Sequence, residues 1–317
     1  MRVLENIPIK PRNIKYDKNT SLRLKVCDCC PLSCKFCHHE GNDKAVDIVI
    51  SDSFLDFLKE MKKSIINEIH LTGGEPTSYK RIVELVDNLV QIGFKVKMTT
   101  NGYFDKAILS KLKNAGLNDI NFSVHTLNPY KLGLLQKPEK DNKWGLSVLS
   151  KQLNNIELAR KLGLKTKINT VFQSCSELLE LIGFCKMQEI ELRVLDDLTP
   201  NSLSIKNIIE FLTIHNSTIT GINFFENSSS YSYDIKTAEN YSFKIKNIRK
   251  FILRSICNNC QRRDLCQEWF YGIRLEQFNE RNYVRLCIHR QDYPAFQTIE
   301  DFVNSEQYTE VKLIAEN

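Results

Sequence analysis

The stretch KVKMTTNGYFDKAILSKLKNAGLNDINFSV, residues 95–124, contains the pattern that decides the fold. It begins with a β-prone segment at 95–100 and continues with a helical period at 106–115. Gly116 follows the helical period, and a second β-prone segment occupies 119–124. A helix that ends at a glycine and is followed at once by a strand is the repeating unit of a parallel α/β sheet. This stretch therefore predicts one such unit.

The same alternation extends from about residue 22 to residue 195. We predict six strands, at 22–26, 69–72, 95–100, 119–124, 165–171 and 191–195. We expect helices between them, at 52–66, 82–92, 106–115, 146–162 and 176–186. Six βα units are too few for a closed eight-stranded barrel. The predicted fold class is therefore α/β, with a partial (βα)6 barrel.

The character of the sequence changes after Leu195, and we predict a boundary near residue 200. Residues 217–232 are polar and rich in Ser and Asn, and 231–236 and 241–248 are expected to form a hairpin. The predicted organisation is an N-terminal extension at 1–20, the barrel at 21–200, and a small C-terminal domain at 201–317.

Composition and charge exclude several classes of protein. The chain has 317 residues, with 44 Lys and Arg against 38 Asp and Glu, and its net charge of +6 is too small to indicate a dedicated nucleic-acid surface. There is no apolar run of about 18 residues and no apolar segment near Met1, so we expect neither a membrane span nor a signal peptide. The predicted location is the cytoplasm.

The eleven cysteines are concentrated in two groups. Five lie at 27–37 and four at 257–287, while Cys175 and Cys185 lie elsewhere and are expected to be core residues. A secreted disulfide framework usually belongs to a short chain with a signal peptide. Tight cysteine groups in a cytoplasmic chain more often bind metal, so we expect two metal centres.

Cys30, Cys34 and Cys37 of the first group have the spacing C-x3-C-x2-C. Thiolates this close on one loop can ligate three irons of a [4Fe–4S] cluster and leave the fourth iron open. The loop follows the first predicted strand, at the edge where parallel sheets bind ligands. The alternative is a zinc knuckle that uses His38 or His39 as its fourth ligand. Cys27 and Cys29 do not fit the spacing and are expected to be bystanders.

The segment Leu71-Thr72-Gly73-Gly74-Glu75-Pro76 follows the second predicted strand. Together with C-x3-C-x2-C it resembles the radical S-adenosylmethionine (SAM) superfamily. The resemblance implies an enzyme of oxidoreductase or lyase type with SAM on the open iron. Such an enzyme cleaves SAM to a 5′-deoxyadenosyl radical, which takes a hydrogen atom from a substrate. A reductant such as flavodoxin or ferredoxin would supply the electron, and the resemblance names no further catalytic residue.

The resemblance also indicates where SAM would bind. The matching positions are Phe36, Gly73, Gly74, Glu75, Thr100, Asn101 and Ser123. In the family, the Gly-Gly-Glu segment hydrogen-bonds the methionyl amine, and the aromatic residue before the third cysteine packs near the adenine. The residue that matches Ser123 often contacts the ribose or carboxylate.

Residues 20–200 resemble, more narrowly, the GTP 3′,8-cyclases of molybdenum-cofactor biosynthesis. Those enzymes have basic residues where this chain has Glu68-Ile69-His70, and a Gly-rich tail where it ends in LIAEN. We therefore expect that this protein is not an active GTP 3′,8-cyclase. Arg23 and Lys167 remain where the cyclases have substrate-facing basic residues. The predicted substrate is a small anionic metabolite of nucleotide or sugar type, in cofactor or natural-product biosynthesis.

Two other functions remain open at this point. A ribosomally made peptide is the alternative substrate, although the roughly twenty residues before the first strand leave no room for a leader-binding domain. The alternative of another class is a non-catalytic protein with two zinc sites.

The second cysteine group consists of Cys257, Cys260, Cys266 and Cys287. Its spacing alone does not distinguish zinc from iron–sulfur. It resembles the auxiliary-cluster domain, of SPASM or Twitch type, found behind radical SAM barrels. That resemblance implies a second, fully ligated [4Fe–4S] cluster. Arg274 resembles an arginine that faces the barrel, so it is a candidate substrate contact or the member of an ordinary salt bridge.

Overall fold

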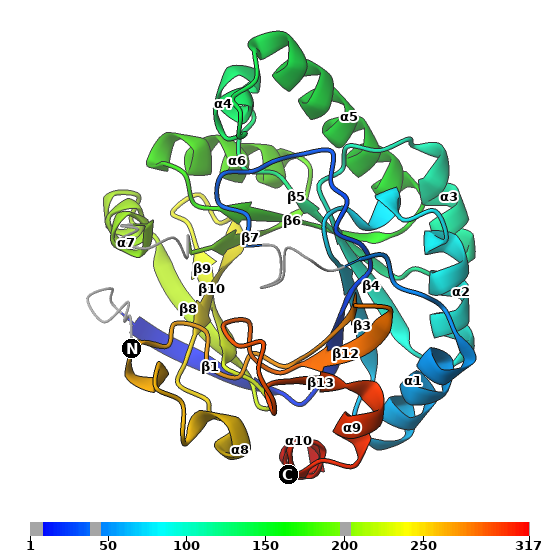
Figure 1. The fold of residues 1–317 in the computed structure, drawn as a ribbon. Helices are drawn as coiled ribbons and strands as arrows, with labels where there is room; N and C mark the ends of the chain where they lie inside the picture. Colours follow the sequence, from blue (N-terminus) through cyan, green and yellow to red (C-terminus); the bar gives the residue numbers. More distant parts are fainter. Residues whose placement is uncertain (1–8, 39–45, 197–203, 317) are drawn as a thin grey trace.

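The computed structural model describes residues 9–38, 46–196 and 204–316, and these form an α/β fold with one curled sheet of thirteen strands (Figure 1). The strands are β1 (Ile9–Asp17), β2 (Ser21–Lys25), β3 (Glu68–Thr72), β4 (Lys95–Thr100), β5 (Asp119–Ser123), β6 (Lys165–Val171), β7 (Glu191–Leu195), β8 (Thr218–Phe225), β9 (Ser230–Lys236), β10 (Ser242–Ile248), β11 (Ile273–Phe278), β12 (Arg281–Arg285) and β13 (Phe296–Thr298). Their order in the sheet is β1-β8-β9-β10-β7-β6-β5-β4-β3-β2-β11-β12-β13.

The six predicted strands are confirmed as β2 to β7, each within one residue at either end. They are neighbours in the sheet and all pair in parallel. Side chains alternate between the two faces of a strand. In β2, Leu22 and Leu24 are fully buried, while Arg23 between them faces the inner side of the sheet. The expected partial barrel is therefore present.

Helices cover the outer face of these strands (Figure 1). They are α1 (Asp52–Ser64), α2 (Ile82–Gln91), α3 (Ala107–Asn114), α4 (Pro129–Leu134), α5 (Asn142–Lys161), α6 (Cys175–Met187) and α7 (Ser204–Ile214). Phe54 and Leu58 of α1 and Met98 and Phe122 of the sheet have no exposed surface. Burial of each such side chain stabilises the fold by about 1.5–3 kcal/mol. The outer, apolar layer thus holds the strands and leaves their inner face for polar groups.

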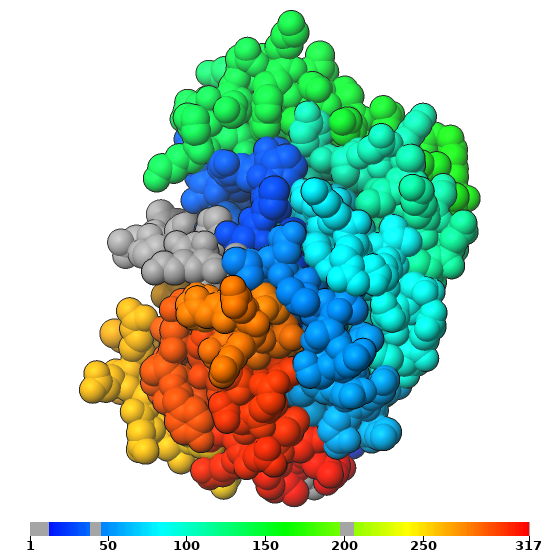
Figure 2. Space-filling model, turned by 45° about the vertical axis from the view of Figure 1, so that its right-hand side comes forward, coloured from blue at the N-terminus to red at the C-terminus, as the bar shows by residue number. Residues whose placement is uncertain are grey.

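A compact hairpin formed by α4 and the start of α5, residues 129–145, projects beyond the other helices (Figures 1 and 2). The predicted helix began at residue 146, and α4 was not predicted. Two glycines allow the close approach of its two halves. A Cβ on Gly145 would lie 1.9 Å from the carbonyl oxygen of Pro129, and one on Gly133 would lie 2.2 Å from that of Lys140. Only residues without a side chain fit here.

The strands after residue 204 extend the same sheet at both of its sides. The hairpin expected at 231–236 and 241–248 is confirmed as β9 and β10. Strand β8 lies in the polar stretch 217–232 and was not predicted, and β1 of the expected extension pairs with it in parallel. Strands from both sides of residue 200 belong to one sheet, so the sheet itself does not mark a domain boundary there. The division at residue 200 stays a prediction.

Five short helices complete the described part of the chain: η2 (Pro76–Ser78), α8 (Arg254–Cys257), η3 (Arg263–Leu265), α9 (Ile299–Val303) and α10 (Glu306–Glu316). None of the described helices is long and apolar enough to cross a membrane.

Candidate active site

Cys30, Cys34 and Cys37 lie on the loop that follows β2, which we call the cluster loop (residues 26–38). Cys30 and Cys34 are half-buried and Cys37 is exposed. The backbone NH of Cys37 donates to the carbonyl of Cys34 at 3.0 Å, which closes a turn between them. Three thiols on one loop are the donor set that three irons of a [4Fe–4S] cluster require, so these residues fit the predicted group.

The protonation of these thiols links cluster binding to pH. Burial raises the pKa of Cys30 to about 12 and that of Cys34 to about 11. At neutral pH the metal-free chain therefore carries thiols, and iron ligands must be thiolates. Loading the cluster would release these protons.

The Gly-Gly-Glu turn after β3 packs directly on the cluster loop. The NH of Gly74 donates to the carbonyl of Cys27, and the NH of Glu75 donates to that of Cys29, each at 2.8 Å. A Cβ on Gly74 would lie 2.4 Å from the carbonyl oxygen of Cys29, and Gly73, at φ +137°, is equally close to Cys27. The two glycines thus permit contact between the loops, a role that the family resemblance did not indicate.

The carboxylate of Glu75 is only 1% exposed and connects two turns. Oε1 accepts hydrogen bonds from the NH (3.1 Å) and hydroxyl (2.7 Å) of Thr77 and from the hydroxyl of Thr100 (2.7 Å). Oε2 accepts one from the NH of Asn101 at 2.7 Å. Burial raises the pKa of Glu75, and these hydrogen bonds oppose that rise. Contact between Glu75 and the SAM amine stays a prediction.

Phe36 and Ser123 lie near polar groups that the sequence did not single out. The ring of Phe36 meets the edge of His125 at 4.7 Å. His125 Nδ1 accepts the NH of Val171 at 3.0 Å, and burial lowers its pKa to about 4, so the imidazole is neutral. Asn169 pairs with Ser123, and its Oδ1 is a buried acceptor without a hydrogen-bond partner among the described residues. Such an acceptor fits a bound polar cofactor.

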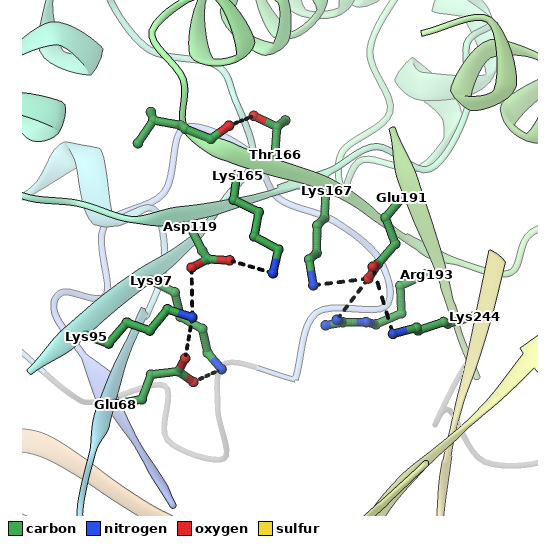
Figure 3. A network of polar contacts seen from close by, with 11 residues as sticks. Glu68, Lys95, Lys97, Asp119, Lys165, Thr166, Lys167, Glu191, Arg193 and Lys244 are labelled. Carbon is green, nitrogen blue, oxygen red and sulfur yellow. Dashed lines mark hydrogen bonds and ion pairs between the residues drawn. The ribbon is translucent and has the colours of Figure 1, made fainter. Parts of the chain in front are cut away.

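The inner face of the barrel carries an extended ion-pair network (Figure 3). Glu68 pairs with Lys97 and with Lys95 (3.7 Å). Glu191 pairs with Lys167 at 3.1 Å, and two further cations, Arg193 and Lys244, lie at 3.5 and 3.9 Å from it. In the whole network six cations share three carboxylates: Lys95, Lys97, Lys165, Lys167, Arg193 and Lys244 with Glu68, Asp119 and Glu191. The inner face is therefore positively charged.

His70 lies among cations of the same inner face. Burial lowers its pKa well below the ordinary value, and four cations lower it further: Arg23, Lys97, Lys246 and Arg193. Its Nε2 lies 2.7 Å from the hydroxyl of Thr99. Arg23 and Lys246 also lie over the ring of Tyr271, at 5.7 and 4.5 Å from its centroid. His70 is neutral, and the cations gather around it.

These contacts bear on two residues that the sequence singled out. Glu68 stands where the cyclases have basic residues, but it is 4% exposed and its charge is compensated by Lys95 and Lys97. Arg274 is also 4% exposed and forms an ion pair with Glu268, so the salt-bridge alternative is present. Contact of Arg274, Arg23 or Lys167 with substrate stays a prediction.

The four cysteines of the second group line one cavity, with Arg263, Trp269 and Arg290 among its other walls. The NH of Trp269 donates to Cys266 Sγ at 3.2 Å. In the described ranges, no three His, Cys, Asp or Glu side chains converge where a single metal ion could be held. Thiols around a cavity suit a cluster, in which each iron takes one thiolate. The second cluster stays a prediction.

The other candidate ligands and cysteines are also placed. His38 is exposed, and His39 lies outside the described residues. Of the two cysteines predicted to be bystanders, Cys27 is fully buried and Cys29 is exposed. Of the two expected in the core, Cys185 is fully buried and Cys175 is partly buried.

Comparison with known proteins finds one family model and several relatives that match part of this chain. Residues 24–173 match the model described as "Radical SAM superfamily". A probable GTP 3′,8-cyclase of Sulfolobus acidocaldarius is 34% identical over 186 residues, 57% of this chain and 57% of that protein. A probable GTP 3′,8-cyclase of Saccharolobus islandicus is 42% identical over 108 residues, 34% of this chain and 35% of that protein. The chain thus matches only part of the length of these relatives.

Two solved structures show a more distant similarity. Streptococcus suis SuiB bound to S-adenosylmethionine has a TM-score of 0.49 at 20% identity, over 62% of this chain and 45% of that one. Methylornithine synthase has a TM-score of 0.47 at 16% identity, over 63% of each chain. Residues 24–173 are thus similar to the radical SAM superfamily, and part of the chain resembles the probable GTP 3′,8-cyclases.

Proposed function

We propose that this protein is a radical SAM enzyme that takes a hydrogen atom from a small anionic metabolite, of nucleotide or sugar type, in cofactor or natural-product biosynthesis. When bound, the [4Fe–4S] cluster and SAM supply the one-electron cleavage that generates a 5′-deoxyadenosyl radical. The observation that carries the substrate class is the positive inner face of the barrel, where six cations share three carboxylates.

The residues of the chain position these groups. The cluster would be held by Cys30, Cys34 and Cys37. Glu75 accepts the NH of Asn101, and the side chain of Asn101 lies beside Cys30. A substrate bound inside the curled sheet would be shielded from water, which would otherwise quench a reactive radical. Correct placement of the reacting C–H bond is the main contribution that a protein makes to such chemistry.

An anion would relieve the crowding of charge in this site. Burial lowers the pKa of Lys97 and of Lys167, and the nearby Arg193 lowers both further. A phosphate placed about 4 Å from one of these cations would gain about 4 kcal/mol at an effective dielectric near 20, before its desolvation is counted. Several such contacts would hold a phosphorylated substrate.

We also propose that GTP 3′,8-cyclisation is not the reaction, although the relatives above carry that name. His70 is neutral where the cyclases have a basic residue. Four thiols line the second cavity, so a [4Fe–4S] cluster held there would have a thiolate on every iron and no open iron for a substrate. Glu68 contributes less to this argument than its sequence position suggested, because it is paired.

The test uses protein loaded with iron and sulfide under anaerobic conditions and reduced with dithionite or flavodoxin. We expect nucleotides or sugar phosphates other than GTP to increase 5′-deoxyadenosine formation, and pyrophosphate to bind in calorimetry. Arg193→Gln should weaken pyrophosphate binding about tenfold, the loss of one charge-assisted hydrogen bond. Arg81→Gln is the matched control, because Arg81 is an exposed cation that pairs with Glu84 outside this network.

Two other outcomes would overturn the proposal. If a peptide increases 5′-deoxyadenosine formation and no phosphorylated compound does, the substrate is a peptide and not a small anionic metabolite. Stoichiometric zinc without sulfide would replace the whole function by a zinc-binding protein.

A further inference from the structure

The α4–α5 hairpin is bound to the cluster loop by its own backbone. The NH of Lys35 donates to the carbonyl of Leu135, and the NH of Lys137 donates to that of Ser33, each at 2.8 Å. Cys34 and Gln136 thereby form an isolated antiparallel bridge. A ligand of the first cluster is thus paired, residue to residue, with a segment more than one hundred positions away.

The side chain of Gln136 completes this connection. It is 1% exposed, and its Oε1 accepts the NH of Ser33 at 2.9 Å. Its Nε2 lies 3.4 Å from the carbonyl oxygen of Leu132 and 3.9 Å from Cys34 Sγ, with the geometry of a donor to both. One amide therefore fixes the backbone before Cys34 and directs an NH toward its sulfur.

The position of Gln136 is itself well defined. Leu32, Leu132, Val148 and Leu149 form a small apolar cluster apart from the main core, and Cys30 and Cys34 pack against it. The two glycine contacts in the hairpin close it from the other side. In Figure 2 this hairpin, in green, stands over the blue segment that follows β2. Gln136 is therefore held by packing, as a group that orients a ligand must be.

We infer that Gln136 is a positioning residue for the first cluster: it orients the Cys34 thiolate and donates a hydrogen bond to its sulfur, which favours the reduced state. This inference rests on the proposed function, because it requires the cluster. Reduction adds negative charge that is shared with the ligating sulfurs, so a donor to sulfur stabilises the reduced form and raises the reduction potential. Asn101 Nδ2, 3.5 Å from Cys30 Sγ, approaches the cluster from the barrel side.

Two substitutions separate orientation from donation. Gln136→Glu keeps an oxygen that can accept the NH of Ser33, but it replaces the amide nitrogen near Cys34 by oxygen. Gln136→Met has a similar length and keeps neither interaction. Gln297→Met is the matched control: Gln297 is 3% exposed and donates to the carbonyl of Pro294 at 3.0 Å, on the last strand of the sheet.

The measurement is a redox titration of the reconstituted protein followed by electron paramagnetic resonance. The first cluster is identified as the one whose signal changes when SAM is added. We expect Gln136→Glu and Gln136→Met to leave about tenfold less reduced first cluster at a fixed potential. For a one-electron couple this is a shift of about 59 mV to lower potential. Gln297→Met should titrate like the wild type.

A potential unchanged in Gln136→Glu, with the first cluster fully loaded, would overturn the inference and leave the proposed function intact. If wild-type protein binds no iron and sulfide, the proposed function fails first. Should Gln136→Met fail to fold, Gln136→Leu takes its place, because it also lacks both the donor and a charge. A lower potential in Gln136→Glu alone does not decide the question, since a carboxylate beside the thiolate would itself disfavour reduction.

Discussion

Substitution of Glu75 by Gln tests whether this residue stabilises the site before any cofactor binds. The carboxylate accepts three hydrogen bonds at Oε1 and one at Oε2. An amide has one accepting oxygen and one donating NH2 group. If its oxygen replaces Oε1, the NH2 group faces the NH of Asn101, which approaches the carboxylate to 2.7 Å in the native protein.

The expected cost follows from that mismatch. A buried donor that loses its acceptor costs about 1–3 kcal/mol. We therefore expect Glu75→Gln to lower the free energy of unfolding of the iron-free, reduced protein by about 1–3 kcal/mol. Because the same turn carries Asn101 beside Cys30, SAM binding to the loaded protein should weaken as well.

The assay is denaturant unfolding of the iron-free protein, followed by SAM binding to the loaded form. Glu84→Gln is the control, because Glu84 is an exposed helix residue paired with Arg81. Suppose that Glu75→Gln has the same free energy of unfolding as the control but binds SAM more weakly. This result would refute the role of Glu75 in stabilising the fold and leave only direct contact with the cofactor. Unchanged SAM affinity in Glu75→Ala would refute that contact.

Three further predictions concern the metal, the pH dependence and the substrate. Reconstituted protein should hold about eight irons, as two four-iron clusters require, and replacement of Cys30, Cys34 and Cys37 by Ala should remove about half; retention of all iron in that variant would contradict the assignment. Because the pKa of His125 falls from 6.5 to about 4 on folding, its stabilisation is fully present above pH 6.5 and is lost as the pH falls toward 4. Wild type should therefore lose about 2–3 kcal/mol more than His125→Asn over that range in denaturant titrations, and equal losses would rule this out. GTP should not increase 5′-deoxyadenosine formation, and the gene should not rescue a strain without the cyclase; rescue would overturn this expectation.

The barrel strands were predictable because each alternates apolar and polar residues and several follow a glycine-terminated helix. Strand β8 was missed because it lies in the polar, Ser- and Asn-rich stretch 217–232. Helix α4 was missed because it has only six residues and contains both Pro129 and Gly133. The alternation of apolar and polar residues is visible in the local sequence. Helix α4 is not, because its formation depends on packing against α5.

The cysteine ligands could be found from spacing, whereas the residues around them could not. Gln136 approaches Cys34 only because the hairpin folds over the cluster loop. Glu68 was interpreted without its partner, since the register of β3 against β4 brings Lys97 beside it. Both contacts join segments that are distant in the sequence, so they can be identified only once the fold is known.

The continuous sheet has a practical consequence for anyone who wishes to study the barrel alone. Strand β2 is covered on one side by β11, with Arg23 opposite Arg274, and β7 is covered by β10. A fragment cut at residue 200 would turn both strands into bare edges, with unpaired NH and carbonyl groups available to neighbouring molecules. Such edges promote strand-to-strand aggregation. The part of the chain after residue 204 therefore covers both edges of the barrel, independently of any metal at the second cysteine group.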